Sequence, residues 1–408
     1  MRRLSPLNHL SESVLHSHVR QIRYLIFLKD VLVLALTCFG GPQVHLVMFL
    51  ERFVQKRRYI TEAELLELQA LCQVLPGPTS TQTITALGFK IGGPTLAYLT
   101  VLVWSLPAVI VMTLAALGIS YLQQHHISLS FMRFVEPMAI GFLAYGGYSI
   151  GSKVIHNQSH WIILGISAVV SYIFPSPYMT PIVVILGGVI TSFQYQRLQK
   201  LDKTPIRIEW ANFFLWLGVL IAAALLGKIT NWLPIRLFEN FYRNGSLVFG
   251  GGQVLNPMLY TEFVEFKQWL SEQEFLTGMA LAQIVPGPVF SIASYIGALS
   301  MRNDGVFGQL IGSTAASFGI FLPGTFLIFF VYRFWNELKK YRGVRASLEG
   351  LNAASVGLTI AAVIRMFMAT ATTSTGIFSI LLTICLLYFT KTPPYMIVFG
   401  GILLGILL

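Results

Sequence analysis

The chain carries one unusual block of sequence twice. Residues 39–78 align with residues 249–288 at a constant offset of 210, without a gap, and seventeen of the forty aligned positions are identical. Both copies open with F-G-G-x-Q-V and close with Q-x-x-P-G-P, so each copy interrupts an apolar segment with Gly or Pro. In a membrane protein, interrupted apolar segments at matching positions of two halves are the best sequence indication of a transport site.

Composition places the chain among polytopic α-helical membrane proteins. Apolar residues make up 55% of the 408 residues and charged residues 11%, with a mean hydropathy of +0.68, whereas a soluble domain carries about a quarter charged residues. The sequence lacks the alternating segments of roughly ten residues that build a membrane barrel. The net charge of +11 sits mainly in a few loops, which favours a role in orientation over nucleic-acid binding.

The apolar segments follow a similar plan in two halves. After a cytoplasmic N-terminal segment at 1–23, we expect a first transporter repeat at 24–195, a basic cytoplasmic linker at 196–210, an extra connecting helix in 211–234 and a second repeat at 235–408. No short apolar core with a cleavage site follows the N-terminal arginines, so no cleaved signal peptide is expected. The expected elements are 24–50, 65–92, 95–122, 134–155, 161–174 and 179–195, then 235–261, 275–300, 307–332, 349–368, 376–390 and 394–408.

The predicted fold class is an all-α polytopic membrane protein with two inverted-topology repeats, broken or re-entrant at Gly-Gly and Pro-Gly-Pro. If the first two elements of each half are re-entrant hairpins, every strongly basic loop lies in the cytoplasm with the N-terminus, as the positive-inside bias requires. If each first element crosses fully, thirteen spans result and Arg57 and Arg58 lie outside. The charge bias favours hairpins, and both topologies invert the second half. Capping boxes at Thr61–Glu64 and Ser271–Glu274 predict two helix starts at the membrane surface.

The breaks are where polar chemistry is expected. Backbone groups that a broken helix frees cannot face lipid, because each unsatisfied group costs several kcal/mol there. Pro-Gly-Pro ends one half-helix and begins the next, whose first amides and positive dipole end form an anion site. With inverted halves, two such N-termini point at each other near the bilayer midplane. Close packing through small residues is the alternative, but two copies of the same four-part pattern favour binding.

The expected substrate site draws on both blocks, and the first block is the more polar, so we expect it to supply most hydroxyl donors. His45 is expected to carry a proton, to donate to an anion, or only to pack. The site residues are Gly40, Gly41, Gln43, His45, Gln73, Pro76, Gly77, Pro78, Thr79, Ser80 and Thr81 in the first half, and Gly250, Gly251, Gln253, Gln283, Pro286, Gly287, Pro288 and Ser291 in the second.

Ionisable residues in or near apolar segments are usually paired or functional, because charge inside a membrane is costly. We expect neutralising pairs between Lys29 and Asp30 and between Arg243 and Glu239, or else a role in binding or gating. The three cysteines lie in apolar stretches, which argues against a disulfide framework or a metal cluster. The chain has no H-E-x-x-H motif and its histidines are scattered, so neither an enzyme nor a cofactor is expected.

The paired blocks resemble the chromate ion transporter family in its two-domain, long-chain form. That resemblance implies export of chromate from the cytoplasm across the inner (plasma) membrane, two homologous halves of opposite topology, and use of the proton motive force. The family's second block often carries His after G-G-G, where this chain has Gln253. The resemblance rests on F-G-G-P-Q-V-H (39–45), K-R-R-Y-I-T-E (56–62), A-L-C-Q-V-L-P-G-P-T-S-T-Q (70–82), F-G-G-G-Q-V-L-N-P (249–257), the stretch 269–275 and A-Q-I-V-P-G-P-V-F (282–290).

The expected partners are chromate as substrate, protons as coupling ion, the lipid bilayer and a second copy of the chain in a homodimer. Sulfate stays open as the substrate, because it is a tetrahedral dianion of nearly the same shape. A channel of the same architecture is the alternative mechanism, and uphill flux that collapses with a protonophore separates the two.

Overall fold

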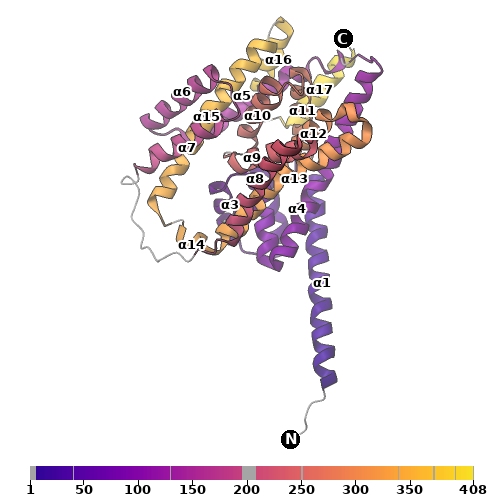
Figure 1. Ribbon diagram of the computed structural model, residues 1–408, viewed down its shortest axis with the longest axis vertical. Coiled ribbons are helices and arrows are strands. Elements are labelled where there is room, and N and C mark those ends of the chain that lie inside the picture. Colours follow the sequence, from indigo (N-terminus) through magenta and orange to yellow (C-terminus); the bar gives the residue numbers. More distant parts are fainter. Residues whose placement is uncertain are drawn as a thin grey trace.

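The computed structural model describes residues 6–39, 41–128, 130–194, 208–249, 251–338, 340–370, 373–390 and 392–407. These residues form helices and connecting turns and contain no strand, which confirms the all-α class. Four helices are long and apolar enough to cross a membrane, at 79–124, 211–230, 302–334 and 342–369. Figure 1 shows the helices gathered into one body, with the N-terminal part of the first helix projecting from it.

The helices follow the expected plan closely. The first half contains α1 (Pro6–Thr37), α2 (Pro42–Phe49), the π-helical segment η1 (Leu50–Lys56), α3 (Glu62–Val74), α4 (Thr79–Gln124), α5 (Val135–Val154), α6 (Gln158–Ile173) and α7 (Met179–Ser192). After α8 (Ala211–Thr230), the second half contains α9 (Leu233–Leu247), α10 (Gly252–Tyr260), the π-helical segment η4 (Thr261–Phe266), α11 (Glu272–Ile284), α12 (Ile292–Ser300), α13 (Gly305–Val331), α14 (Trp335–Leu338), α15 (Arg342–Thr370), α16 (Ser374–Cys385) and α17 (Pro394–Leu407).

One boundary differs from the expectation. Helix α1 begins at Pro6 and therefore runs through most of the expected N-terminal segment, because Pro6 suits a first helical turn and no Pro or Gly follows before Gly40. The expected boundary between 65–92 and 95–122 lies inside α4, where Gly93 takes the non-helical angles φ 72° and ψ −163° and separates two helical segments. Most of the expected linker lies outside the described residues.

Both predicted capping boxes are confirmed. The Thr61 hydroxyl accepts a hydrogen bond from the Glu64 amide, and the Glu64 carboxylate accepts one from the Thr61 amide. Ser271 and Glu274 repeat this arrangement at the start of α11. In each half, the helix that follows the first broken element therefore begins with the same capping interaction.

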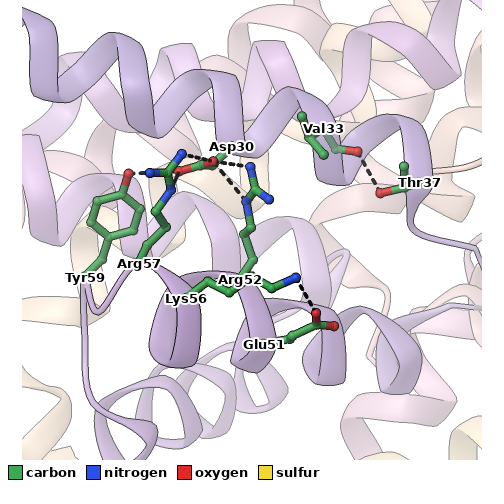
Figure 2. A network of polar contacts seen from close by, with 8 residues as sticks. All are labelled: Asp30, Val33, Thr37, Glu51, Arg52, Lys56, Arg57 and Tyr59. Atoms are coloured by element: carbon green, nitrogen blue, oxygen red, sulfur yellow. Dashed lines mark hydrogen bonds and ion pairs between the residues drawn. The ribbon is translucent and has the colours of Figure 1, made fainter.

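Side-chain contacts show that the broken elements fold back into antiparallel helical hairpins. Asp30 of α1 is bonded to Arg52 beyond the break, so the chain reverses between Thr37 and Pro42 (Figure 2). Glu64 of α3 pairs with Lys90 of α4, so the chain also reverses at Pro-Gly-Pro. The second half repeats both reversals, as its pairs show: Arg243 with Glu262, at 2.6 Å, and Arg302 with Glu274, at 2.6 Å.

The hairpins of the two halves open toward opposite ends of α4 and α13. Near Lys90, Phe89 stacks on Phe329 and contacts Tyr332, just beyond the C-terminus of α13. At the other end, Gln123 of α4 donates to Glu274, at the open end of a second-half hairpin, at 2.9 Å. Helix α13 has 27 residues and is therefore about 40 Å long, enough to cross a bilayer. The open ends of the first-half and second-half hairpins therefore lie at opposite ends of α13.

The contact between α4 and α13 joins the two halves. Thr113 of α4 and Ser313 of α13 share a buried hydrogen bond of 2.6 Å between their hydroxyl oxygens. Helix α8, by contrast, has only 11% of its apolar window buried. The centre of the molecule is therefore built by the long helices and hairpins of both halves, with α8 at its edge.

We predict that Thr113→Cys with Ser313→Cys forms a disulfide, because hydroxyls in direct contact place two β-carbons near disulfide range. The background carries Cys38→Ala, Cys72→Ala and Cys385→Ala, and the linked peptides are measured by mass spectrometry after mild oxidation. Thr113→Cys with Thr314→Cys is the control, since Thr314 lies on the exposed face of α13. Equal linkage in the two pairs would contradict the packing.

Candidate functional site

The hairpin tips of the two halves meet through a reciprocal pair of backbone hydrogen bonds. The Gly77 amide donates to the Val248 carbonyl at 2.8 Å, and the Gly287 amide donates to the Cys38 carbonyl at 2.8 Å. Val248 and Gly287 are the equivalents of Cys38 and Gly77 at the offset of 210. Each Pro-Gly-Pro turn therefore binds the Gly-Gly break of the other half, as in a contact across a two-fold axis.

Packing around the two turns follows the same symmetry. A β-carbon at Gly77 would lie 3.6 Å from the Gly324 Cα of α13, and one at Gly287 would lie 3.4 Å from the Ala108 Cβ of α4. Gly324 and Ala108 directly follow Pro323 and Pro107, the two prolines at matching depth in the sequence. The tips therefore pack against interior positions of α13 and of the α4 segment that follows Gly93, and not against their ends.

The breaks need glycine for its backbone freedom. Gly77 has φ 123° and Gly287 has φ 100°, while Gly41 and Gly251, which precede α2 and α10, have φ 82° and 76°. Side chains disfavour these angles, and holding one there costs about 1–3 kcal/mol. The repeated glycines thus serve the two sharp reversals in each half.

The first-half tip presents buried polar groups at the N-terminus of α4. Thr81 accepts a hydrogen bond from the Trp104 indole at 3.1 Å. Gln82 donates through Nε2 to the Pro76 carbonyl at 2.7 Å, while its buried Oε1 has no partner among the described residues. Ser80 is also buried beside them. One carboxamide therefore lies beside both Gly77 and Gly324, with an acceptor atom left over.

The second-half tip is more apolar. Ser291 is buried, and its hydroxyl has no partner among the described residues. Ser294 donates to the Ser291 carbonyl at 2.7 Å. Phe290 and Ile292, which stand at the positions of Ser80 and Gln82, are fully apolar. The two tips thus share a backbone arrangement but differ in their side chains.

His45 is buried in an aromatic cage. Its ring makes an edge contact with Trp104 at 5.4 Å between centroids and lies 6.3 Å from the Phe49 ring. Neither ring nitrogen makes a hydrogen bond to a described residue. The packing interpretation explains the ring contacts, and the two unpaired nitrogens leave a polar role available.

The structure describes the predicted site residues to different extents, and not all of those it describes are buried. Gln73 is exposed and Gln283 is partly exposed. Gly40, Gly250 and the side chains of Gln43 and Gln253 lie outside the described residues. The structure brings together the following predicted residues around the tips, whether as contact partners or as neighbours on the turns: Gly41, His45, Pro76, Gly77, Pro78, Thr79, Ser80, Thr81, Gly251, Pro286, Gly287, Pro288 and Ser291.

Three residues at the tips were not among the predicted site residues. Gln82 could have been predicted from the sequence, because it belongs to the polar run T-S-T-Q-T that follows the first Pro-Gly-Pro. Trp104 and Gly324 carry no such signal, because Trp104 approaches the first-half tip only where α4 folds back at Gly93, and Gly324 only where α13 packs against that tip.

One of the two expected ion pairs is wrong. Asp30 is bonded to Arg52, Arg57 and Tyr59, which the hairpin reversal brings to it. Lys29 is its sequence neighbour, and successive residues of a helix do not share a face. The other pair is confirmed: Arg243 and Glu239 lie 3.0 Å apart.

Two cavities lie away from the tips. An apolar cavity of about 340 Å³ lies between α8 and α9, beside Ala223 and Pro234. A cavity of about 10 Å³ is lined by Ser171, Thr261 and Arg365. Among the described residues, no group of three or more His, Cys, Asp and Glu is arranged to hold a metal ion.

The chain matches the model of the family described as Chromate transporter in two regions, residues 25–193 and 235–406. A chromate transport protein of Cupriavidus metallidurans is 27% identical, covering 90% of this chain and 89% of the relative. A probable chromate transport protein of Synechococcus elongatus is 27% identical, covering 87% of each. A chromate transport protein of Pseudomonas aeruginosa is 25% identical over 82% of this chain and 79% of the relative. No solved structure matches the chain.

A glycine series tests the geometry of the tips. We predict that Gly77→Ala lowers the free energy of unfolding by about 1–3 kcal/mol, because it meets a disfavoured φ and places a β-carbon 2.8 Å from Gln82 Nε2. Gly287→Ala costs less, since it shares the disfavoured φ but has more space. Gly118→Ala, on an open face of α4, is the control and leaves stability unchanged or higher. Thermal unfolding of purified protein measures the order; equal midpoints for the alanine variants of Gly77 and Gly118 would refute it.

Proposed function

This chain belongs to the chromate transporter family, and from that premise we propose that it exports chromate from the cytoplasm, driven by the proton motive force. The family membership supports the substrate class. The export direction, the coupling ion and the binding site are our proposal. The observation that carries it is the reciprocal contact of the four hairpin tips, which pack against interior positions of α4 and α13.

The dianion is proposed to bind at these tips. One fixed cation would leave half of the charge of a dianion unbalanced, whereas several amides, hydroxyls and carboxamides spread the stabilisation over many donors. The first turn of α4 offers Thr79, Ser80 and Thr81, whose amides have no carbonyl partner within the helix. Ser291 adds a buried hydroxyl from the other half. A tetrahedral oxyanion is then recognised by the geometry of the donors more than by net charge.

Transport requires the tips to separate, because they pack directly on each other in this conformation. The two hairpin sets open toward opposite ends of α4 and α13. Rocking one set against the other therefore breaks the contact toward one end while the opposite end stays closed, which is alternating access. His45 is the proposed proton carrier, since its unpaired imidazole lies beside the helix that carries Trp104.

The charge distribution supports an inner-membrane protein with a cytoplasmic N-terminus. Arg52 and Arg57 lie at the open end of the first-half hairpins. Arg333 pairs with Glu209 at the end of the basic linker, and its neighbour Tyr332 contacts Phe89 at the same end. These basic segments therefore gather at one end of the long helices, which the positive-inside bias assigns to the cytoplasm.

The decisive experiment is flux of labelled chromate into proteoliposomes with an imposed pH gradient of either sign. We expect accumulation against the chromate gradient in one polarity and its collapse on addition of a protonophore. Downhill flux alone, insensitive to the protonophore, would identify a channel. Excess unlabelled sulfate is added in a parallel reaction, and stronger competition by sulfate than by unlabelled chromate would assign sulfate as the preferred substrate.

We predict that Gln82→Glu raises the apparent KM for chromate about tenfold, because a carboxylate beside the tip repels a dianion by ~1–4 kcal/mol at 4 Å. Gln82→Met keeps the length of the side chain without charge and changes KM less. Both variants are assayed in the same proteoliposomes after their thermal midpoints are checked. Equal KM values for the two variants would remove Gln82 from the anion's surroundings.

A further inference from the structure

A buried carboxylate fixes two guanidinium groups at the open end of the first hairpin (Figure 2). Asp30 is fully buried. Its Oδ1 accepts from Arg52 Nε at 2.9 Å and Nη2 at 2.5 Å, and from Arg57 Nη2 at 3.1 Å. Its Oδ2 lies 2.8 Å from Arg57 Nε and accepts from the Tyr59 hydroxyl at 2.9 Å. One carboxylate thus holds two arginines in fixed positions.

The cluster keeps surplus positive charge. Its other pair, Lys56 with Glu51 at 2.6 Å, is neutral, whereas Asp30 balances only one of its two arginines. The side chain of Arg52 is 26% exposed and that of Arg57 is 41% exposed. Each guanidinium has five N–H donors, and the Nη1 groups are not among the atoms that contact Asp30. Both arginines therefore keep N–H donors that are fixed in position and partly exposed, and their positive charge is not fully balanced.

The equivalent place in the second half lacks this surplus. Glu262 and Lys267 occupy the positions of Arg52 and Arg57 at the offset of 210. The three carboxylates of the second-half cluster each face a cation, and the pairs are Glu239 with Arg243, Glu262 with Arg243 and Lys267, and Glu265 with Arg365. Since the two halves share their backbone plan, the surplus positive charge comes from the side chains of the first half and not from the fold.

Resting on the proposed function, we propose that Arg52 and Arg57 form a peripheral capture site for a tetrahedral oxyanion, distinct from the tips. Planar guanidinium edges match two oxygens of such an anion. Asp30 positions the two guanidinium groups. Its negative charge also lowers their affinity for the oxyanion, because a capture site must release its ligand. A cationic surface raises the local concentration of anions, and the balanced second-half cluster offers no equal attraction where the anion leaves.

The capture site is continuous with the tips. Arg52 lies on η1, which continues α2 back to the break at Gly41. A series of aromatic contacts connects the same two regions. The Tyr59 and Phe53 ring centroids lie 6.2 Å apart, those of Phe53 and Phe49 lie 5.7 Å apart, and Phe49 contacts both Trp104 and His45. One packed element therefore joins the peripheral arginines to the N-terminus of α4.

The test compares Arg57→Gln with Arg58→Gln by chromate uptake into inside-out membrane vesicles. Arg58 is exposed and does not contact Asp30, so its loss removes the same charge one residue away. We expect Arg57→Gln to raise KM about fivefold at low salt with kcat unchanged, and the effect to shrink at about 0.3 M salt through screening. Arg58→Gln changes KM less than twofold. Tyr59→Phe, which removes one bond to Asp30 and no charge, raises KM less than Arg57→Gln does, and its effect does not depend on salt.

Equal KM values for the two arginine variants overturn the capture site, as does a rise in KM for Tyr59→Phe as large as that for Arg57→Gln. The source of the oxyanion is assigned with purified protein in vesicles of phosphatidylcholine alone or with added phosphatidylglycerol. A KM effect in both lipids assigns the site to the free dianion, and an effect confined to phosphatidylglycerol assigns it to a lipid phosphate. If the wild-type protein moves no chromate, the proposed function fails; if it does and Arg57→Gln matches Arg58→Gln, only the capture site fails.

Discussion

A polypeptide that breaks its helices inside a bilayer must satisfy the freed backbone groups from within. In this protein each half supplies hydrogen-bond partners for the broken helices of the other half. The amide of one Pro-Gly-Pro turn donates to the carbonyl that precedes the opposite Gly-Gly break, in both directions. The same region holds the close approach of the two turns to Gly324 and Ala108, and the α4–α13 contact between Thr113 and Ser313.

The sequence predicts the features whose causes are local. The reversals near Gly41 and Gly77 and the capping boxes depend on a few adjacent residues with defined backbone preferences, and the structure has them where expected. The partner of Asp30 was not predicted, because Arg52 reaches it only after the chain reverses. The same holds for Trp104, which comes to Thr81 through the folding back of α4 at its Gly93 kink. Non-local contacts therefore account for what the sequence did not reveal about the candidate site.

The two halves share a backbone and differ in chemistry. At the tips, buried Ser80 and Gln82 stand where the second half has the apolar residues Phe290 and Ile292. At the open ends, a guanidinium stands where the other half has a carboxylate, at Arg52 and Glu262. In the proposed mechanism, the symmetric frame carries the conformational exchange, because both directions of opening need the same backbone contacts. The asymmetric side chains then make the two open ends differ in their attraction for an anion.

Helix α8 buries little of its surface, yet it bears on the topology of the whole chain. It is mostly exposed, and its contacts with the body include Trp216, which donates to Ser246 at 3.0 Å and accepts from Tyr242 through its carbonyl, and Phe213, which contacts Phe330 of α13. In the proposed topology, the traversals of the first half return the chain to the side where it began. A second copy joined directly would then be parallel to the first. In that topology, the single passage of α8 places the second half antiparallel to the first, which is the orientation that lets the two sets of tips face each other.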